Sequence, residues 1–356
     1  MKHTLLVTGA TGRLGGRLLE ALAERGGFSR IFALSRRPEA GPSPARAEFV
    51  RGDVTEAIPP ELAGEVTAIL HAAADTRFSA PLEMARAVNV EGTRNTLAFA
   101  ARCPRLERFG FVSTVHVAGR RTGAILENEL EHETGFVNAY EQSKYEAEQL
   151  VREHMGSLPI MVCRLSTVLG DARTGEVAGI GAVHQAVRFF FHSLAPMIPG
   201  EADSPVDLIS SEYAVAAVST LFEERFEAGR SFQVCAGEDA LPLGELLELT
   251  RESFLCYRPA WRKRAIEMPA IVDLPTFELF VRSVEEVGAT GLRQCVNAIK
   301  HFVPQMAYPK RFDDRDCLRA LAPTGVVRPP LRDFYPLVVK HLIEPSTIGS
   351  EPLGAS

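Results

Sequence analysis

The feature that most constrains the fold is a regular alternation of short β-rich runs with amphipathic stretches over the first 165 residues. Leu14, Leu18 and Leu22, for example, mark the apolar face of the first expected helix. The alternation is typical of βαβ units, whose right-handed crossovers place helices on both faces of a parallel sheet. The sequence therefore predicts an α/β fold with a doubly wound parallel sheet. The expected strands are residues 4–8, 30–35, 47–51, 67–72, 109–115 and 159–165.

This regularity changes after Gly170. Three glycines and the phenylalanine run 189–191 then indicate an excursion from the sheet. Residues 205–209 and 231–235 are expected to return as late strands, with a helix over 213–226 between them. We therefore predict two parts. Residues 1–170 together with 205–238 form a dinucleotide-binding Rossmann domain, and residues 171–204 with 239–356 form a smaller carboxyl-terminal substrate-binding lobe.

Length and composition exclude several classes of protein. A chain of 356 residues with 46% hydrophobic residues can bury a full core, and its net charge of -6 provides no basic field for nucleic acid. No apolar run approaches the roughly 20 residues that span a bilayer, so no integral membrane segment is expected. The six cysteines form no CxxC pair, which predicts no metal site and buried thiols. Since the amino terminus also lacks the regions of a signal peptide, we expect a cytoplasmic protein.

Three glycines lie between the first strand and the first helix at a GxxGxxG spacing. Glycine lets the backbone bend closely around a pyrophosphate, which the N–H groups and the dipole of the helix amino terminus then bind. A glycine turn that only packs helix on strand would give the same pattern, but the strand–turn–helix context favours a dinucleotide site. The predicted contacts in this loop are Gly9, Thr11, Gly12, Arg13, Leu14 and Gly15.

The end of the second strand predicts NADP rather than NAD. An acidic residue there would bind an unphosphorylated ribose, whereas this chain has Arg36 and Arg37, whose guanidinium groups suit a 2'-phosphate. Arg13 can reach the same phosphate, although a solvated surface pair is the alternative for the two arginines. Asp53 is placed to hold the adenine amino group, with a capping role as the alternative. The predicted cofactor set also includes Val54, Ala72, Ala73 and Lys144.

The predicted catalytic residues begin with Tyr140 and Lys144, which lie one turn apart on one helix face. That spacing lets the lysine ammonium stabilise a phenolate, so we expect it to lower the tyrosine pKa towards the range useful for proton transfer. Thr114, preceded by Ser113, ends the fifth strand at the edge where open α/β sheets bind ligands. Asn89 lies on the preceding helix.

With these residues, positions 4 to 240 resemble the extended short-chain dehydrogenase/reductase superfamily. The resemblance implies that Tyr140 is the general acid or base and that Lys144 also holds the nicotinamide ribose. It implies further that the Thr114 hydroxyl orients the carbonyl and that Asn89 supports a proton-relay water. The glycine loop, the strand-end hydroxyl and the Tyr–Lys pair occur in the order that this chemistry requires.

Finer motifs resemble the fatty acyl and thioester reductases, the male-sterility-type branch of that superfamily. These motifs are the segment 71–78 after the fourth strand, the catalytic helix 138–148, Arg164 with residues 170–175, and residues 206–207. There are two departures, because Leu165 replaces the proline expected after Arg164 and Arg13 replaces the usual aromatic residue. The carboxyl-terminal 116 residues carry no motif that identifies a substrate.

The resemblance implies reduction by NADPH of an acyl thioester on coenzyme A or an acyl carrier protein, to an aldehyde or, with a second hydride, an alcohol. The runner-up is an NADP-dependent ketone or alcohol oxidoreductase acting on a small molecule. A nucleotide-sugar epimerase is disfavoured because those relatives usually carry a tyrosine where this chain has Ala118 before Gly119. A non-catalytic NADP sensor is disfavoured because it would have no use for Tyr140 and Lys144.

Two further features have competing interpretations. His71 and His116 are expected to be packed, hydrogen-bonded histidines rather than catalytic bases, since Tyr140 already supplies the proton. Trp261, flanked by Arg258, Arg262, Lys263 and Arg264, is either an exposed anchor for a coenzyme A phosphate or acidic carrier protein, or a core residue on a helix with solvated charges.

Overall fold

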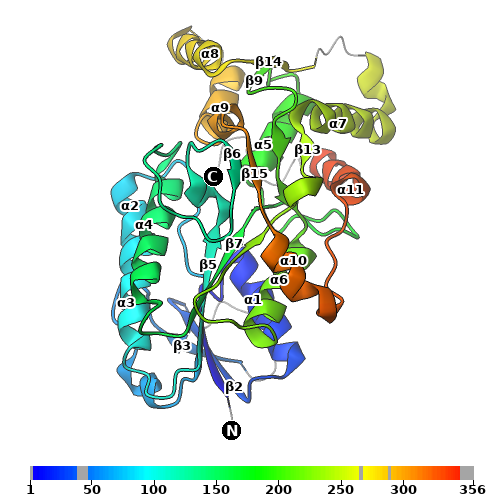
Figure 1. Cartoon of the computed structure of the whole chain (residues 1–356). Helices are drawn as coiled ribbons and strands as arrows, with labels where there is room; N and C mark the ends of the chain where they lie inside the picture. Colours follow the sequence, from blue (N-terminus) through cyan, green and yellow to red (C-terminus); the bar gives the residue numbers. More distant parts are fainter. Residues whose placement is uncertain (1–2, 38–46, 264–267, 288–289, 345–356) are drawn as a thin grey trace.

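A seven-stranded parallel sheet organises the computed structural model, which describes residues 3–37, 47–263, 268–287 and 290–344 (Figure 1). The strand order is β12-β7-β5-β4-β1-β2-β3, and every neighbouring pair is parallel. The chain therefore has the predicted doubly wound α/β fold. The strands of the sheet are β1 (Thr4–Thr8), β2 (Arg30–Ser35), β3 (Ala47–Arg51), β4 (Ala68–His71), β5 (Arg108–Thr114), β7 (Ile160–Leu165) and β12 (Ser231–Val234).

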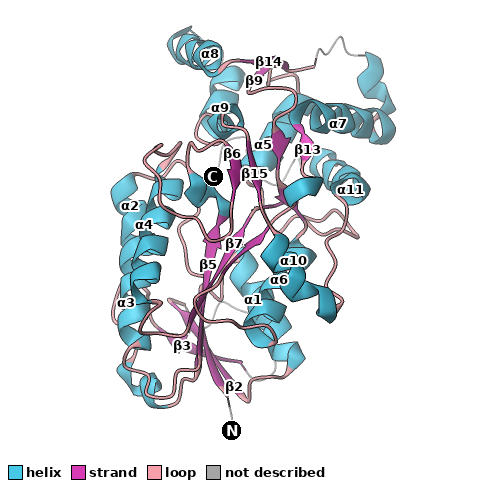
Figure 2. Ribbon diagram, in the orientation of Figure 1, coloured by secondary structure: helices cyan, strands magenta, loops and turns pink. Residues whose placement is uncertain are grey.

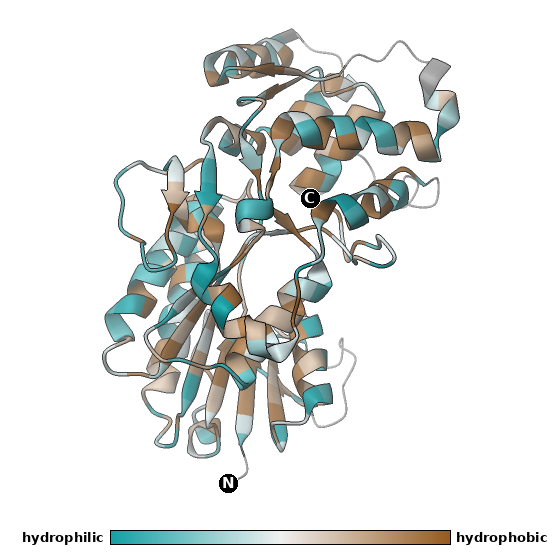
Figure 3. Cartoon of the chain, turned by 45° about the vertical axis from the view of Figure 1, so that its right-hand side comes forward, coloured by the Kyte–Doolittle hydropathy of each residue, from teal (hydrophilic) through white to brown (hydrophobic). Residues whose placement is uncertain are grey.

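Helices cover both faces of the sheet, as the crossover rule requires (Figure 2). On one face α1 (Arg13–Arg25) packs beside α6 (Ser211–Glu223) through a shared apolar cluster. On the other face lie α2 (Leu82–Arg86), a π-helical turn (Ala87–Glu91), α3 (Gly92–Ala100) and α4 (Ala139–His154). Strands β1 and β7 are buried along their whole length, and hydrophobic residues run through the sheet (Figure 3).

All six strands predicted in the first 165 residues form within one residue of the expected bounds. Residues 231–235 also return to the sheet, because β12 pairs with β7. Residues 205–209 do not join it. They form β10 (Pro205–Val206), which pairs with β13 (Leu241–Pro242), and β11 (Leu208–Ile209), which pairs with β8 (Thr167–Val168). Asp207 separates the two strands, and its carboxylate accepts hydrogen bonds from the N–H groups of Ala236 and Gly237.

A second apolar cluster lies beyond the carboxyl ends of the strands. It is built mainly from α5 (Ala182–Phe191), α7 (Leu243–Tyr257), α8 (Leu274–Val287), α9 (Thr290–Ile299) and α11 (Leu331–Ile343). Strands β9 (Met197–Pro199) and β14 (Ala270–Val272) pair beside it. The chain then returns to the sheet edge, where β15 (Lys310–Phe312) pairs with β6 (Gly123–Ile125) and α10 (Arg315–Leu321) follows. The predicted boundaries of the dinucleotide-binding domain and the substrate lobe stay a prediction.

Short 3-10 helices complete the described chain. They are Pro60–Gly64, Val115–Ala118, Gly237–Asp239, Pro259–Lys263, Val303–Ala307 and Ala322–Thr324. The helix Val115–Ala118 directly follows β5, and Val303–Ala307 precedes β15. These two short helices therefore bring a carboxyl-terminal segment to the edge of the sheet where β5 ends.

Candidate active site

The glycine loop passes against the segment that follows β4. Gly9 has a φ of 71°, and a Cβ there would lie 2.6 Å from the backbone nitrogen of Ala73. A Cβ on Gly15 would in turn collide with the carbonyl of Gly9. Both positions therefore require glycine, which places the predicted cofactor residues Ala72 and Ala73 beside the loop.

The amino terminus of α1 is suited to an anion. The helix begins at Arg13 after the N-cap Gly12, and no side chain caps it. Its first-turn N–H groups therefore have no partner within the helix, and its dipole is positive at this end. Thr11 is exposed at the tip of the loop, whereas Leu14 packs against the core beneath the helix. This geometry fits the pyrophosphate of a dinucleotide.

The arginines predicted to set the preference for NADP are exposed to solvent at the end of β2. The Arg36 side chain is 80% exposed, and its Nε is 4.0 Å from a carboxylate oxygen of Asp53. Asp53 also accepts a hydrogen bond from the N–H of Thr55 at 3.0 Å, which closes a turn and caps no helix, so its predicted contact with the adenine stays a prediction. Val54 is buried against Gly92, at the start of α3. A 2'-phosphate near Arg36 would meet a guanidinium whose donors are largely free for it.

Arg13 points elsewhere. A Cβ on Gly179 would collide with the Arg13 guanidinium, so this side chain crosses from the glycine loop to the segment after β8. The loop residue therefore links the predicted cofactor site to residues 171–181.

The predicted catalytic tyrosine lies at the start of α4. This helix begins after Asn138, whose side chain accepts a hydrogen bond from the N–H of Glu141 at 3.0 Å. The Tyr140 hydroxyl lies near that of Thr114, and this contact favours the phenolate, so α4 and β5 bring two hydroxyl groups together. Burial raises the pKa of Tyr140 to about 12. The phenol therefore retains its proton at neutral pH.

The predicted lysine lies one turn further along α4, against the sheet. The Nζ of Lys144 donates to the carbonyl of Val112 at 2.9 Å and lies 4.2 Å from the ring centroid of Phe111. Burial lowers the Lys144 pKa to about 8. Our expectation that this ammonium lowers the pKa of Tyr140 is wrong for this structure. Burial outweighs every favourable contact of the phenol, and the lysine faces the strand instead.

Asn89 ties three elements together from the π-helical turn. Its Nδ2 donates to Ser143 Oγ at 2.9 Å and to the carbonyl of Asp75 at 3.0 Å, while its Oδ1 accepts from the Asp75 N–H at 2.7 Å. These contacts join α4 to the segment after β4. The geometry gives Asn89 a positioning role, and its support of a proton-relay water stays a prediction.

Ser113 has a different task from Thr114. Its hydroxyl donates to Glu148 at 2.6 Å, and Glu148 forms a fully buried ion pair with Arg164 at 2.6 Å. This network links β5, α4 and β7 beneath the site. Leu165, the departure noted in the sequence, pairs in register with Thr114 across the two strands.

Both histidines are packed and hydrogen-bonded, as expected. His71 lies between Thr8 and Thr93, with ring nitrogen to hydroxyl distances of 2.6 and 3.0 Å. His116 lies 3.3 Å from the Thr167 hydroxyl. Burial lowers both histidine pKa values to about 3, so each ring is neutral at physiological pH. The structure therefore favours structural roles for the pair.

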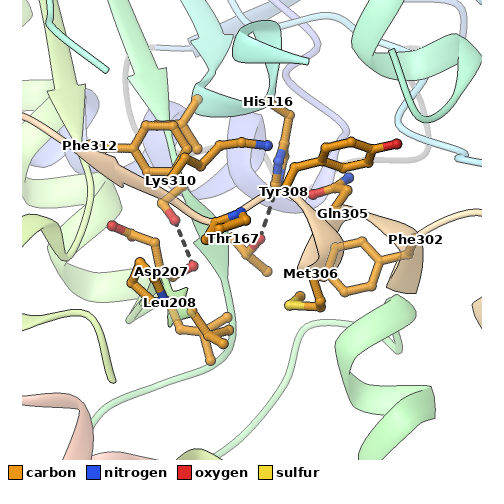
Figure 4. Close-up of a pocket in the computed structure, with 15 residues that line it drawn as sticks. His116, Thr167, Asp207, Leu208, Phe302, Gln305, Met306, Tyr308, Lys310 and Phe312 are labelled. Atoms are coloured by element: carbon orange, nitrogen blue, oxygen red, sulfur yellow. Dashed lines mark hydrogen bonds between the residues drawn. The ribbon is translucent and has the colours of Figure 1, made fainter. Parts of the chain in front are cut away.

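A cavity beside Thr114 contains residues that the sequence did not point to (Figure 4). His116 and Thr167 line it from the sheet side, and Phe302, Gln305, Tyr308 and Lys310 line it from the carboxyl-terminal segment. The Phe302 ring stacks on Phe78 at 5.3 Å, and Phe78 contacts the Tyr140 ring at 5.4 Å. No local spacing marks these residues, because they meet only when a distant segment folds back.

Trp261 is a core residue. Its side chain is 6% exposed, its ring lies 5.1 Å from that of Phe254, and its Nε1 donates to the carbonyl of Phe191 at 3.0 Å. The hypothesis of an exposed indole anchor is therefore wrong. Arg258 donates to the carbonyl of Ile343, while Arg264 and the side chains of Arg262 and Lys263 lie outside the described residues.

Two negative findings apply to the described ranges only. Among those residues, no group of three or more histidine, cysteine or acidic side chains is placed to hold a metal ion. Within the same ranges, no helix has the length and apolar character needed to cross a membrane.

Comparisons with known proteins agree with this arrangement. Residues 42–218 match the family model described as male sterility protein. The chain is 29% identical over 186 residues to the hybrid PKS-NRPS synthetase pvhA of Talaromyces variabilis, a match covering 48% of this chain and 4% of that protein. It is 40% identical over 67 residues to the chloroplastic fatty acyl-CoA reductase 2 of Arabidopsis thaliana, covering 19% and 11% of the two chains. The chain therefore spans only a small part of either relative.

Solved structures extend the similarity to nearly the whole chain. The terminal R domain of the myxalamid PKS-NRPS biosynthetic pathway superposes with a TM-score of 0.80 at 26% identity, covering 99% of this chain and 93% of that one. An archaeal thiolation-reductase di-domain (TM-score 0.71, 18% identity, 96% and 75% covered) shares the fold. So does the Bacillus cereus UDP-glucuronic acid 4-epimerase in complex with NAD (0.65, 16%, 96% and 100%). This chain resembles the extended short-chain dehydrogenase/reductase superfamily, and its similarity extends to the male-sterility-type fatty acyl and thioester reductases.

Proposed function

We propose that this chain is an NADPH-dependent reductase of an acyl thioester, carried by coenzyme A or a carrier protein, that yields an aldehyde and, with a second hydride, an alcohol. The observation that carries the proposal is the pair of neighbouring hydroxyl groups of Thr114 and Tyr140 at the carboxyl edge of the sheet. Two such donors side by side suit an oxygen that becomes negatively charged during reaction. The names of the similar reductases point to the same substrate class.

The donors around the glycine loop support a phosphorylated dinucleotide. The uncapped amino terminus of α1 would hold the pyrophosphate, and Arg36 would pair with a 2'-phosphate. Lys144 would hold the nicotinamide ribose, as the resemblance implies. The preference for NADP over NAD rests on Arg36 and on the lack of an acidic residue at that strand end.

The bound dinucleotide would supply a hydride to the thioester carbonyl carbon. Tyr140 and Thr114 donate hydrogen bonds to the carbonyl oxygen as its charge develops. The resulting tetrahedral adduct re-forms the carbonyl, the C–S bond breaks, and the thiolate leaves and takes up one proton. The products are an aldehyde, a thiol and the oxidised cofactor. The raised pKa of Tyr140 suits an acid that must hold its proton until the oxygen becomes basic.

The carrier remains part of the proposal. The named archaeal structure combines a thiolation domain with a reductase domain, which supports an acyl carrier protein as the partner of this chain. A cytoplasmic location is proposed from the cysteines, which are all free and, except for the exposed Cys256, buried, as is common in a reducing compartment.

A substrate panel tests the function directly. The protein is incubated with NADPH and with matched acyl thioesters, aldehydes, ketones and a nucleotide sugar, while nicotinamide absorbance is followed and products are identified. We expect thioester-dependent oxidation of NADPH with release of one thiol per aldehyde. Reduction of ketones without any thioester turnover would replace the proposal with the small-molecule oxidoreductase. Sugar epimerisation without net cofactor oxidation would replace it with the epimerase.

A further inference from the structure

The cavity beside Thr114 is lined by hydrogen-bond donors, and it lies close to the hydroxyl groups of Thr114 and Tyr140. His116, which lines it, donates its backbone N–H to Thr114 Oγ1 at 3.2 Å. On the opposite side, the aromatic contact from Phe302 through Phe78 leads to Tyr140. A group bound in the cavity would therefore lie next to a carbonyl held by the two hydroxyl groups.

The hydrogen-bond donors of the cavity are only partly used. Gln305 is 7% exposed, and within the described chain its buried Nε2 has no hydrogen-bond partner. Lys310 Nζ donates to the carbonyl of Gly119 at 2.7 Å, which leaves two of its three N–H groups for other acceptors. Burial lowers the pKa of the Lys310 ammonium below its usual range, while the nearby Glu141 carboxylate opposes this shift. A buried amide without a partner gains most from a ligand that brings an acceptor.

Two side-chain acceptors of the cavity, by contrast, are already occupied. The Asp207 carboxylate accepts from two backbone N–H groups, at 2.7 and 2.9 Å. The His116 ring nitrogen is paired with the Thr167 hydroxyl, and the imidazole is neutral. At the rim, the cationic groups of Arg120 and Lys310 each lie 5.9 Å from the ring centroid of Tyr308. The cavity thus presents unused donors beside occupied side-chain acceptors, and Glu141 is the acidic residue near Lys310 and Arg120.

The cavity is also small. Its volume is about 50 Å³, against roughly 10–15 Å³ for a single buried water. This space matches a chain of a few atoms that ends in oxygen.

We propose that this cavity binds the acyl part of the substrate, and that Gln305 and Lys310 select short acyl groups ending in a carboxylate over apolar groups of equal length. The inference rests on the proposed thioester reduction and narrows its substrate class. Arg120 contributes long-range attraction at the rim, while Gln305 supplies the hydrogen bond that an apolar chain cannot satisfy.

Pairs of thioesters with equal chain length test the selection. Reduction of glutaryl-CoA is compared with that of valeryl-CoA, and 3-hydroxybutyryl-CoA with butyryl-CoA, at neutral pH with saturating NADPH. We expect kcat/KM for glutaryl-CoA to exceed that for valeryl-CoA at least about tenfold, because a site that bonds an oxygen rejects the analogue without it. The hydroxyl pair should show a smaller preference of the same sign.

Substitution of Gln305 tests whether the cavity causes the preference for glutaryl-CoA. Gln305→Leu should reduce the glutaryl preference by about tenfold, mainly through a fall in kcat/KM for glutaryl-CoA. Gln185→Leu is the matched control, since it removes another buried glutamine, from α5, whose Oε1 also has no partner in the described chain. The control should keep the preference. Equal or faster reduction of the apolar thioesters, or an unchanged preference in Gln305→Leu, would overturn the inference.

A binding measurement separates this inference from the proposed function. Monomethyl glutarate and methyl valerate are titrated calorimetrically into the protein saturated with NADP. If no thioester is reduced, the proposed function fails, but tighter binding of the carboxylate probe and its loss in Gln305→Leu would still support the cavity assignment. Equal binding of the two probes, or equal binding by the wild type and the variant, would reject it.

Discussion

The cofactor side and the reaction side of the site differ in solvent exposure. On the cofactor side, the Arg36 side chain is 80% exposed, and the uncapped amino terminus of α1 begins at exposed residues of the glycine loop. On the reaction side, burial moves the pKa values of Tyr140, Lys144 and His116 far from their usual ranges. An exposed arginine carries the same charge in the folded and the unfolded chain. The buried groups, by contrast, have their shifted pKa values only in the folded chain. The first side can therefore be altered locally, but the second depends on remote packing.

The largest expected effect concerns the reaction side. Tyr140→Phe should lower turnover by roughly two to four orders of magnitude, the usual range for loss of general acid–base catalysis. Cofactor binding should change little, since the phenyl ring fills the same space beside Phe78. Steady-state kinetics together with NADPH fluorescence titration measure both quantities. Turnover within a few fold of the wild type, with NADPH still bound, would contradict the catalytic assignment.

The next effect is a pH dependence set by Lys144. Its pKa is about 8, so the ammonium loses its proton above that pH, and kcat should then fall about tenfold per pH unit. Tyr140, with a pKa of about 12, does not titrate in this window. Lys144→Arg should remove the alkaline decline, even at a lower plateau, because a guanidinium stays charged. A wild-type profile that is flat between pH 7 and roughly 10 would show that the charge is not used.

Loss of activity above pH 8 should not be loss of fold. The unfolded lysine has a pKa near 10.5, so between about 8 and 10.5 the unfolded chain binds more protons than the folded one. The contribution of Lys144 to the free energy of unfolding therefore rises with pH in this window. Circular dichroism across the same pH range is the control for the kinetic profile.

On the cofactor side we expect a smaller, selective effect. Arg36→Ala should raise the Michaelis constant for NADPH about tenfold, as expected for one lost charge-assisted pair, and leave that for NADH nearly unchanged. Arg102→Ala removes an exposed arginine after α3 and serves as the matched control. If the wild type uses NADH better, and NADPH affinity is unaffected by Arg36→Ala, the preference for NADP is refuted.

The same division explains what the sequence alone could predict. The strands follow short β-rich runs and the Tyr140–Lys144 pair follows the i, i+4 spacing of a helix, so these local patterns predicted them within a residue. The pKa direction of Tyr140 was missed because it depends on burial by tertiary neighbours. Gln305 and Lys310 were missed because they reach the site from far along the chain; Lys310 bonds Gly119 across 191 positions. No periodic pattern in either segment predicts this long-range contact.

The smallest expected effect distinguishes the two arginines that were predicted to share one phosphate. Arg13 lies against Gly179, so it holds the segment after β8 to the glycine loop rather than facing the end of β2. Arg13→Leu should therefore raise the Michaelis constants for NADPH and NADH by similar factors of about five, the equivalent of one hydrogen-bonded contact of about 1 kcal/mol. A loss confined to NADPH would return Arg13 to the 2'-phosphate, and combining it with Arg36→Ala would then give less than additive losses. Independent, additive effects of the two variants are expected instead, because they act on different parts of the cofactor site.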